Sequence, residues 1–287
     1  MYHLQVLNLI LINCLLALGA YLPFSTGLMV ACLGTFMSVG AIVSAAAHSK
    51  AGIPLLFAVI VGGISASICG IFVALICSKL KGFLFTVSTL GLGELARVVA
   101  TNNEFLGGAL GYKNVEFVSV ENFEFCLCSM LIIFIIIFIL FEKSDIRRAL
   151  SVIKENEILA TTLGINVLYH RVLCLGAGGF IIGIAGGFYI HNVGILEPRM
   201  FGFESSLIIL MFPILGGYRH FLGPLIGAFL LTFVPEALRF STNSRMILYG
   251  ITLIIVISAR PEGIIGSSKL RSKFLLRILS ANLLRLH

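Results

Sequence analysis

The stretch MLIIFIIIFILF, from Met130 to Phe141, decides the fold because all of its residues are apolar. A helix that crosses a membrane needs about 20 predominantly apolar residues, and this run forms the core of one at 125–142. Strands of a transmembrane barrel alternate apolar with polar residues, and this run does not. Since every backbone polar group in lipid must be paired within the protein, the pattern predicts an all-α bundle of membrane-spanning helices.

The composition extends this prediction to the whole chain. Of its 287 residues, 59% are hydrophobic and 11% are charged, whereas about a quarter of a soluble domain is charged. Glycine, proline and charged residues divide the sequence into about nine spans, within a range of about eight to ten. Their expected limits are 4–22, 27–47, 53–78, 82–100, 125–142, 168–191, 204–216, 223–240 and 246–260. The span 204–216 is short for a full crossing, which indicates a half-helix or a re-entrant segment.

Basic residues indicate which ends of the spans face the cytoplasm. Five Lys or Arg residues lie in 142–171 and six lie after residue 259, whereas 101–124 carries four Glu and one Lys. We therefore expect 142–171 on the cytoplasmic side and 101–124 outside, which with nine spans places the N-terminus outside. The net charge of +7 then reflects basic loops beside anionic lipid rather than a nucleic-acid partner. The segment 267–287 is expected to be a basic amphipathic tail on the inner leaflet, or a frayed basic end.

The sequence contains no set of residues typical of an enzyme. No G-x-x-x-x-G-K-[ST] loop is present, and GIIGSSK at 263–269 follows a span rather than a strand, so we do not expect the chain to hydrolyse nucleotide itself. Zinc-protease and hydrolase-elbow motifs are also absent. The seven cysteines match no metal spacing and are interpreted as buried thiols. We expect no metal and no cofactor bound by this chain.

Two pairs of charged residues within spans are candidate functional residues, because ionisable groups are costly in lipid. Glu94 and Arg97 lie three residues apart in GLGELAR, and Glu236 and Arg239 have the same spacing in FVPEALR. Residues three apart share a helix face. Both pairs are expected near the outer ends of their spans, where they either line the outer mouth of a pathway or form interfacial ion pairs. The hydroxyl-rich TVSTLG at 86–91 either contacts substrate or bonds to its own helix.

Glycine recurs at four-residue spacing within two spans. One span carries Gly179, Gly183 and Gly187, and another carries Gly223 and Gly227. Small residues at this spacing let helices approach closely in lipid. We predict that these glycines pack helices together; a role in shaping a conduit is the weaker alternative.

The stretch RRALSVIKENEILATTLGINVLYHR, at 147–171, interrupts the apolar chain with a charged, helix-prone sequence. On a helical wheel, one side of 151–164 is mostly apolar. That side carries Val152, Ile153, Leu159, Ala160 and Leu163, with Asn156 among them. Asp145 or Ser151 can cap the start, and Gly164 can adopt the left-handed conformation that ends a helix. The sequence thus predicts a short cytoplasmic amphipathic helix that either lies on the membrane or docks into a groove on a soluble partner.

Within this stretch, ENEILATTLGINV resembles the cytoplasmic coupling loop of ABC importer permeases, with Ala160 and Gly164 at the loop's characteristic positions. Four further motifs agree in order with the M-type permease subunit of branched-chain amino acid ABC importers. They are STLGLGELAR, LGINVLYHRVLCLGAGGFIIGIAGGFY, ILGGYRHFLGPLIGA and ARPEGIIG. The chain departs from the family after Gly107 and Gly108, where ALGYKNVEF follows, and at Arg219 and His220, where small residues are common.

The resemblance implies a permease domain over 1–266, with a coupling loop at about 143–168, followed by the tail 267–287. It implies a second related permease subunit, two cytoplasmic ATPase subunits that hydrolyse ATP, and a substrate-binding protein on the outer side of a bacterial inner membrane. The positions implied to contact the ATPases are Ser151, Glu155, Asn156, Glu157, Ala160 and Gly164. A permease for another small solute, such as a urea-like amide, sugar or nucleoside, and a stand-alone secondary transporter or channel remain alternatives.

Overall fold

The computed structural model describes residues 2–80, 82–103, 108, 111–112, 120–237, 250 and 263–264. Within these residues it contains ten α-helices and one short 3-10 helix. They are α1 (Tyr2–Ser25), α2 (Leu33–Ala51), α3 (Leu55–Ile76), α4 (Gly82–Asn102), α5 (Val120–Lys143), α6 (Asp145–Glu155), α7 (Glu157–Thr162), α8 (Val167–Val193), η3 (Pro198–Phe201), α9 (Phe203–Gly216) and α10 (Leu222–Ala237).

Five of these helices, α1, α3, α4, α5 and α8, are long and apolar enough to cross a membrane. The predicted all-α membrane fold is therefore confirmed for the described part of the chain. The predicted span 246–260 lies outside the described residues except for residue 250, and the tail 267–287 lies outside them entirely.

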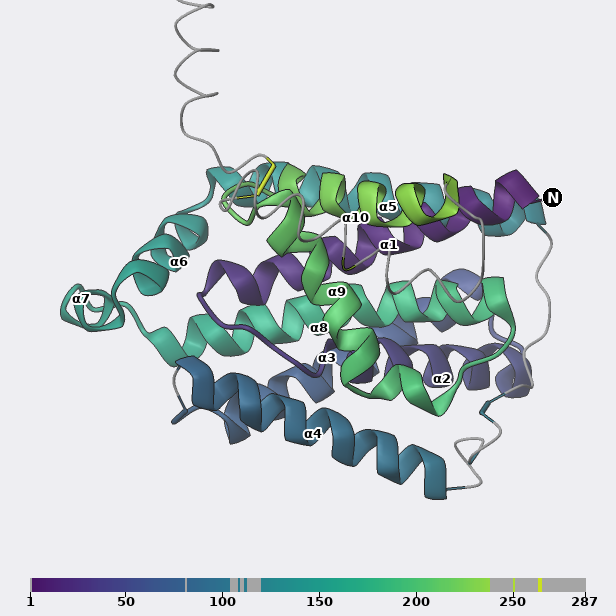
Figure 1. The fold of residues 1–287 in the computed structure, drawn as a ribbon, viewed down its shortest axis with the longest axis horizontal. Helices are drawn as coiled ribbons and strands as arrows, with labels where there is room; N and C mark the ends of the chain where they lie inside the picture. Colours follow the sequence, from purple (N-terminus) through teal and green to yellow (C-terminus); the bar gives the residue numbers. More distant parts are fainter. Residues whose placement is uncertain are drawn as a thin grey trace, which may run out of the picture.

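The centre of the bundle is α8, which packs against α1, α2 and α3 (Figure 1). The structure places the first glycine stripe at these contacts. A Cβ on Gly179 would lie 2.8 Å from the carbonyl oxygen of Ala66, and a Cβ on Gly183 would lie 2.5 Å from the Cβ of Ala66. Gly187 lies against side chains of α2 and α3. These glycines therefore let the backbones of α3 and α8 approach more closely than any side chain would permit.

The second glycine pair lies where α10 packs against α9. Gly227 faces the carbonyl of Phe212, and Gly223 faces the carbonyl of Gly217, at distances that leave no room for a Cβ. Small residues therefore set the spacing of this helix pair as well.

Two connections without α-helix lie between helices of the bundle. Residues 26–32 follow α1 and lead to α2, and residues 194–202 follow α8 and lead through η3 to α9 (Figure 1). The prediction of a span over 27–47 is wrong at its start, because α2 begins only at Leu33. Gly27, at φ +81°, turns the chain after α1. The buried residues that follow it are Leu28, Val30, Ala31 and Cys32.

The helices that precede these two connections, α1 and α8, run in opposite directions. The end of α1 contacts α6, whereas α8 begins beside α7 and runs away from it (Figure 1). We call the end of the bundle that carries α6 and α7 the α6 end. The order of long apolar helix, non-α-helical connection and second helix therefore occurs twice with inverted direction. Such an arrangement is common in transporters, where broken helices meet near the middle of the membrane.

The segment 143–168 extends from the α6 end as two helices (Figure 1). The prediction of a single helix over 151–164 is wrong, because the chain breaks at Asn156, which has φ −155° and ψ 109°. Its side-chain oxygen accepts hydrogen bonds from the backbone N–H groups of Ile158 and Leu159. Asn156 is thus the N-cap of a new helix, α7, and the apolar side expected from one continuous helix is divided between two.

The predicted cap at the start of α6 is wrong, whereas the predicted end of α7 at Gly164 is confirmed. Ser144 caps the start of α6, so the prediction of Asp145 or Ser151 as the cap is wrong. Gly164 ends α7 with φ +77°, and the left-handed conformation predicted for it is confirmed. Backbone N–H groups of Gly164 and Ile165 donate to carbonyls of α7 and close the turn.

Candidate functional site

The short helix α7 exposes apolar side chains at the tip of the α6 end. Ile158 is 73% exposed, Leu163 is 62% exposed and Leu159 is 51% exposed. Ala160 faces the bundle and is fully buried. We call Ile158, Leu159 and Leu163 the α7 patch. A grouped apolar surface of this kind is typical of a surface that contacts another protein or a membrane.

The six positions predicted to contact an ATPase fall into two groups. Four of them are exposed: Ser151, Glu155, Asn156 and Gly164. Ala160 is buried, and the carboxylate of Glu157 accepts two hydrogen bonds of 3.3 Å from the guanidinium of Arg171 at the start of α8. Ala160 and Glu157 therefore seat the segment on the bundle. The predicted set did not include Ile158, although an apolar residue on a charged segment was a signal that pointed to it.

A second candidate site lies where the start of α2 meets the end of η3 and the start of α9. The Gly34 N–H donates to the hydroxyl oxygen of Ser206 (2.9 Å), and the Thr35 hydroxyl donates to the carbonyl of Phe201 (2.8 Å). The start of α2 and the start of α9 thus satisfy polar groups of one another. We call residues 29–35 and 201–206, with the α4 side chains that contact them, the central site.

Helix α4 supplies the remaining partners at the central site. The Ala31 N–H donates to the hydroxyl oxygen of Thr89 (3.1 Å), and the Thr86 hydroxyl donates to a carbonyl of the same segment (3.0 Å). On the other segment, the Phe203 N–H donates to Oε1 of Glu94 (2.9 Å). Polar side chains of α4 therefore pair with backbone groups of residues 29–31 and with the Phe203 N–H, which have no partner within a helix.

The predicted pair Glu94 and Arg97 forms an ion pair, with Arg97 Nε 2.6 Å from Glu94 Oε2. The other carboxylate oxygen binds the start of α9, so Glu94 joins α4 to α9. This contact with α9 is additional to the predicted ion pair, and the role of the pair, at an outer mouth or at the interface, stays a prediction. Sequence reasoning missed the contact because Phe203 is 109 residues away. The side chain of Glu236 and all of Arg239 lie outside the described residues.

An apolar pocket of about 280 Å³ lies beside the central site, between α2, α3 and α4. Cys32 and Thr35 line it from the central site, Phe72 lines it from α3 and Leu92 from α4. Within the described residues, α4 lies at the edge of the bundle (Figure 1) and packs mainly against α2, η3 and α9. The attachment of α4 therefore depends on the central site more than on α3.

Comparison with known proteins identifies the family. The family model described as the permease component of branched-chain amino acid transport systems matches residues 2–257. The chain belongs to this permease family. Its membership confirms the resemblance found in the sequence motifs, and it makes this permease a transport component rather than an enzyme.

Relatives of this permease share the family and differ in cargo. The LivM permease protein of the high-affinity branched-chain amino acid transport system of Escherichia coli (strain K12) is 22% identical over 92% of this permease and 70% of LivM. A probable LivM of Methanocaldococcus jannaschii is 21% identical over 74% of this permease and 68% of its own length. The ribose import permease protein RbsC of Haemophilus influenzae is 22% identical over 93% of this permease and 86% of RbsC. No solved structure shows a significant match.

We expect Glu94→Ala to impair this permease more than Glu94→Gln. Alanine leaves the Phe203 N–H without its acceptor inside the bundle, which costs about 1–3 kcal/mol, whereas glutamine keeps an oxygen at that position. Glutamine loses only the partly exposed pair with Arg97, which is worth about 0–1 kcal/mol. The measurement is the thermal stability of the purified permease, with Arg97→Gln as the control. Equal thermal stability of Glu94→Ala and wild type would show that this hydrogen bond does not help to hold α4 against α9.

Proposed function

We propose that this permease is one of two related membrane subunits of an ATP-driven ABC importer for branched-chain or related amino acids. The observation that carries the proposal is the exposed α7 patch, which sits on a well-capped segment held away from the bundle. Two cytoplasmic ATPase subunits bind there, and a substrate-binding protein delivers cargo at the opposite end. This chain binds no cofactor; the partner subunits hydrolyse ATP.

The distribution of charged residues supports placing the ATPases at the α6 end and the substrate-binding protein at the opposite end. Arg147, Arg148, Lys154 and Arg219 lie at the α6 end, whereas α4 ends and α5 begins at the opposite end, and the sequence 101–124 carries four Glu and one Lys. The positive-inside rule then places the α6 end in the cytoplasm of a bacterial cell, with the permease in its inner membrane. We further propose nine spans, made by α1 to α5, α8 to α10 and residues 246–260. The domain extends over 1–266, and 267–287 is a basic tail on the inner leaflet.

The proposed mechanism converts closure of the ATPases into a change of access within the bundle. Nucleotide-driven closure moves α6 and α7, and the bundle alternates between outward-open and inward-open states. The central site supports this proposal because the connections 26–32 and 194–202 lead into it. Broken helices form the substrate and coupling sites of many transporters. The glycines at the α3–α8 and α9–α10 contacts give rigid helix pairs that move as units.

A sugar or another small solute is a second candidate cargo. The observation that favours it is the relative from Haemophilus influenzae, a ribose import permease whose similarity extends over more of its own length than that of the LivM relatives. Cargo selectivity therefore has to be measured, because family membership is shared by permeases for chemically different solutes.

Uptake by the whole complex tests the proposed function. The complex is purified from its native host through a tagged copy of this permease, reconstituted into vesicles and supplied with ATP. We expect ATP-dependent uptake of labelled leucine, reduced by valine and isoleucine and unaffected by ribose. Uptake of labelled ribose instead would establish the second candidate. Leucine uptake that continues without ATP would identify a stand-alone transporter and refute the importer.

A further inference from the structure

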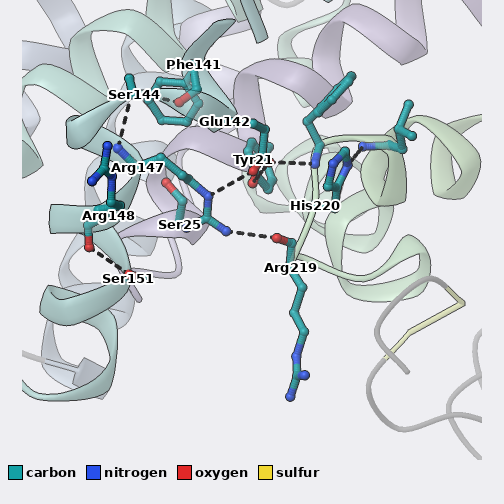
Figure 2. Close-up of polar contacts among 12 residues, drawn as sticks. Tyr21, Ser25, Phe141, Glu142, Ser144, Arg147, Arg148, Ser151, Arg219 and His220 are labelled. Atoms are coloured by element: carbon teal, nitrogen blue, oxygen red, sulfur yellow. Dashed lines mark hydrogen bonds and ion pairs between the residues drawn. The ribbon is translucent and has the colours of Figure 1, made fainter. Parts of the chain in front are cut away.

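A polar cluster ties α6 to the rest of the bundle at the α6 end. Glu142, next to the last residue of α5, accepts hydrogen bonds from the Tyr21 hydroxyl (2.7 Å) and from the Phe221 N–H (3.1 Å). Its second oxygen lies 3.5 Å from Nε of Arg147 on α6. Figure 2 shows Glu142 beside Tyr21, with Arg147 directed toward them. One carboxylate therefore contacts α1, α6 and the turn before α10.

Arg147 extends these connections from α6. Its Nη2 donates to the carbonyl of Arg219 (2.9 Å), and its guanidinium lies 5.9 Å from the centre of the Tyr21 ring. Figure 2 shows the Arg219 carbonyl facing Arg147 while the Arg219 side chain points away. The side chains of Arg147 and Glu142 are 16% and 17% exposed, so their interaction is only weakly screened by solvent.

The other end of α6 contacts the same two chain segments. The ammonium of Lys154 donates to the carbonyl of Phe24 (3.4 Å) and lies 3.4 Å from the centre of the Tyr218 ring. Burial, with Arg147 and Arg219 nearby, lowers the pKa of Lys154 to about 8. Both ends of α6 therefore hold the end of α1 and the turn 217–221.

These two segments are the ones that lead to the central site. The end of α1 continues directly into residues 26–32 and the start of α2. The turn 217–221 is the far end of α9, whose first residues bind Glu94 and the start of α2. A displacement of α6 is thus passed along two short paths, each made of continuous chain, to the two halves of one contact.

We propose that Arg147 and Glu142 are positioning residues that make the central site follow the movement of α6. The proposal rests on the proposed function, in which ATPases move α6 and α7. Neither residue needs to touch cargo or ATPase. Their role is to keep α6, the end of α1 and the turn 217–221 moving as one body, so that work done on α7 reaches the central site.

The test compares Arg147→Met with Arg148→Met in the reconstituted complex. Methionine keeps an apolar stem at position 147 but removes the charge that pairs with Glu142 and the donor that reaches the Arg219 carbonyl. Arg148 is the matched control on the same helix, because its side chain is 77% exposed and pairs with Asp145, which is 91% exposed. The readouts are ATPase binding, ATP hydrolysis and the amount of cargo transported per ATP.

We expect Arg147→Met to bind ATPase normally, because the α7 patch is unchanged, but to transport at least about tenfold less cargo per ATP. Arg147→Lys should recover part of the loss, Glu142→Gln should reproduce it, and Arg148→Met should match wild type. These additional variants decide the matter if Arg147→Met does not fold. An unchanged transport ratio in Arg147→Met, or an equal loss in Arg148→Met, would overturn the proposal. Failure of the wild-type complex to use ATP would instead refute the proposed function.

The native thiol of Cys32 gives a second readout at the central site itself. Cys32 is 1% exposed and ends the segment 26–32. In wild type we expect its alkylation rate, followed by mass spectrometry, to change when nucleotide is added, with buried Cys174 of α8 as the internal reference. Arg147→Met should remove this nucleotide dependence. Its persistence in the variant would show that movement reaches the central site by another route and would overturn the proposal.

Discussion

Replacing both Ile158 and Leu163 with serine is expected to abolish ATPase binding without unfolding the permease. Both side chains are more than half exposed, so the substitution removes little packing within this chain. In the proposed complex they fill apolar sites on the ATPase, and well-buried anchors of this kind are each worth about 2 kcal/mol or more. Losing both anchors costs about 4 kcal/mol and weakens binding by roughly 700-fold. The measurement is co-purification of the ATPase with the tagged permease.

The control for this prediction is Ile146→Ser, which removes a partly exposed isoleucine from α6 outside the proposed contact. It should retain ATPase. Undiminished ATPase binding by the Ile158→Ser and Leu163→Ser double variant would contradict the docking role of the α7 patch. Glu157→Lys and Gly164→Pro should also lose ATPase, but for a different reason. The first breaks the contact with Arg171, and the second places proline where φ is +77°, so both displace α7 from its seat.

Gly183→Leu is expected to prevent this permease from folding. A single Cβ at this position would already lie 2.5 Å from the Cβ of Ala66, with backbone atoms of Gly62 and Gly63 of the same helix at 3.0 Å. The remaining carbons of leucine have no space unless α3 and α8 separate, and overpacking by even a few methylenes costs about 1–3 kcal/mol. The expected result is loss of the monodisperse peak when detergent extracts are analysed by size-exclusion chromatography.

Two variants make this prediction specific to the helix contact. Gly91→Leu is the matched control, because a Cβ on this α4 glycine meets no heavy atom within 4 Å. It should give protein that behaves as wild type does. The milder Gly183→Ala should lower the melting temperature, and adding Ala66→Gly should restore part of it by removing the nearest atom. If Gly183→Leu folds as well as Gly91→Leu, close backbone contact does not hold α3 and α8 together.

The sequence was sufficient for features that depend on local pattern. The apolar run 130–141 identifies a spanning helix because lipid leaves few alternatives. Four-residue spacing locates the glycines of α8 at a helix contact, and Gly164 ends α7 because few other residues tolerate a positive φ. Each of these properties is set by residues within a turn or two of helix.

The central site was not predictable in the same way, because its determinants are distant in the chain. Residues 27–32 are as apolar as a spanning helix, and only Gly27 hints that they are not part of one. Backbone groups here and at the start of α2 find partners far away in the chain: the Ala31 N–H donates to the hydroxyl of Thr89, 58 residues away, and the Gly34 N–H donates to the hydroxyl of Ser206, 172 residues away. The break at Asn156 was similarly hidden, since asparagine caps a helix or interrupts one with equal ease.

The distance between Gly34 and Ser206 also sets an order of events during biosynthesis. A chain that elongates at about 5–20 residues per second needs roughly 10–30 s to make the 172 residues between them. Through that interval the nascent first half lacks the acceptor that its Gly34 N–H uses in the finished protein. We therefore expect water or another polar group to bind the Gly34 N–H until α9 is inserted.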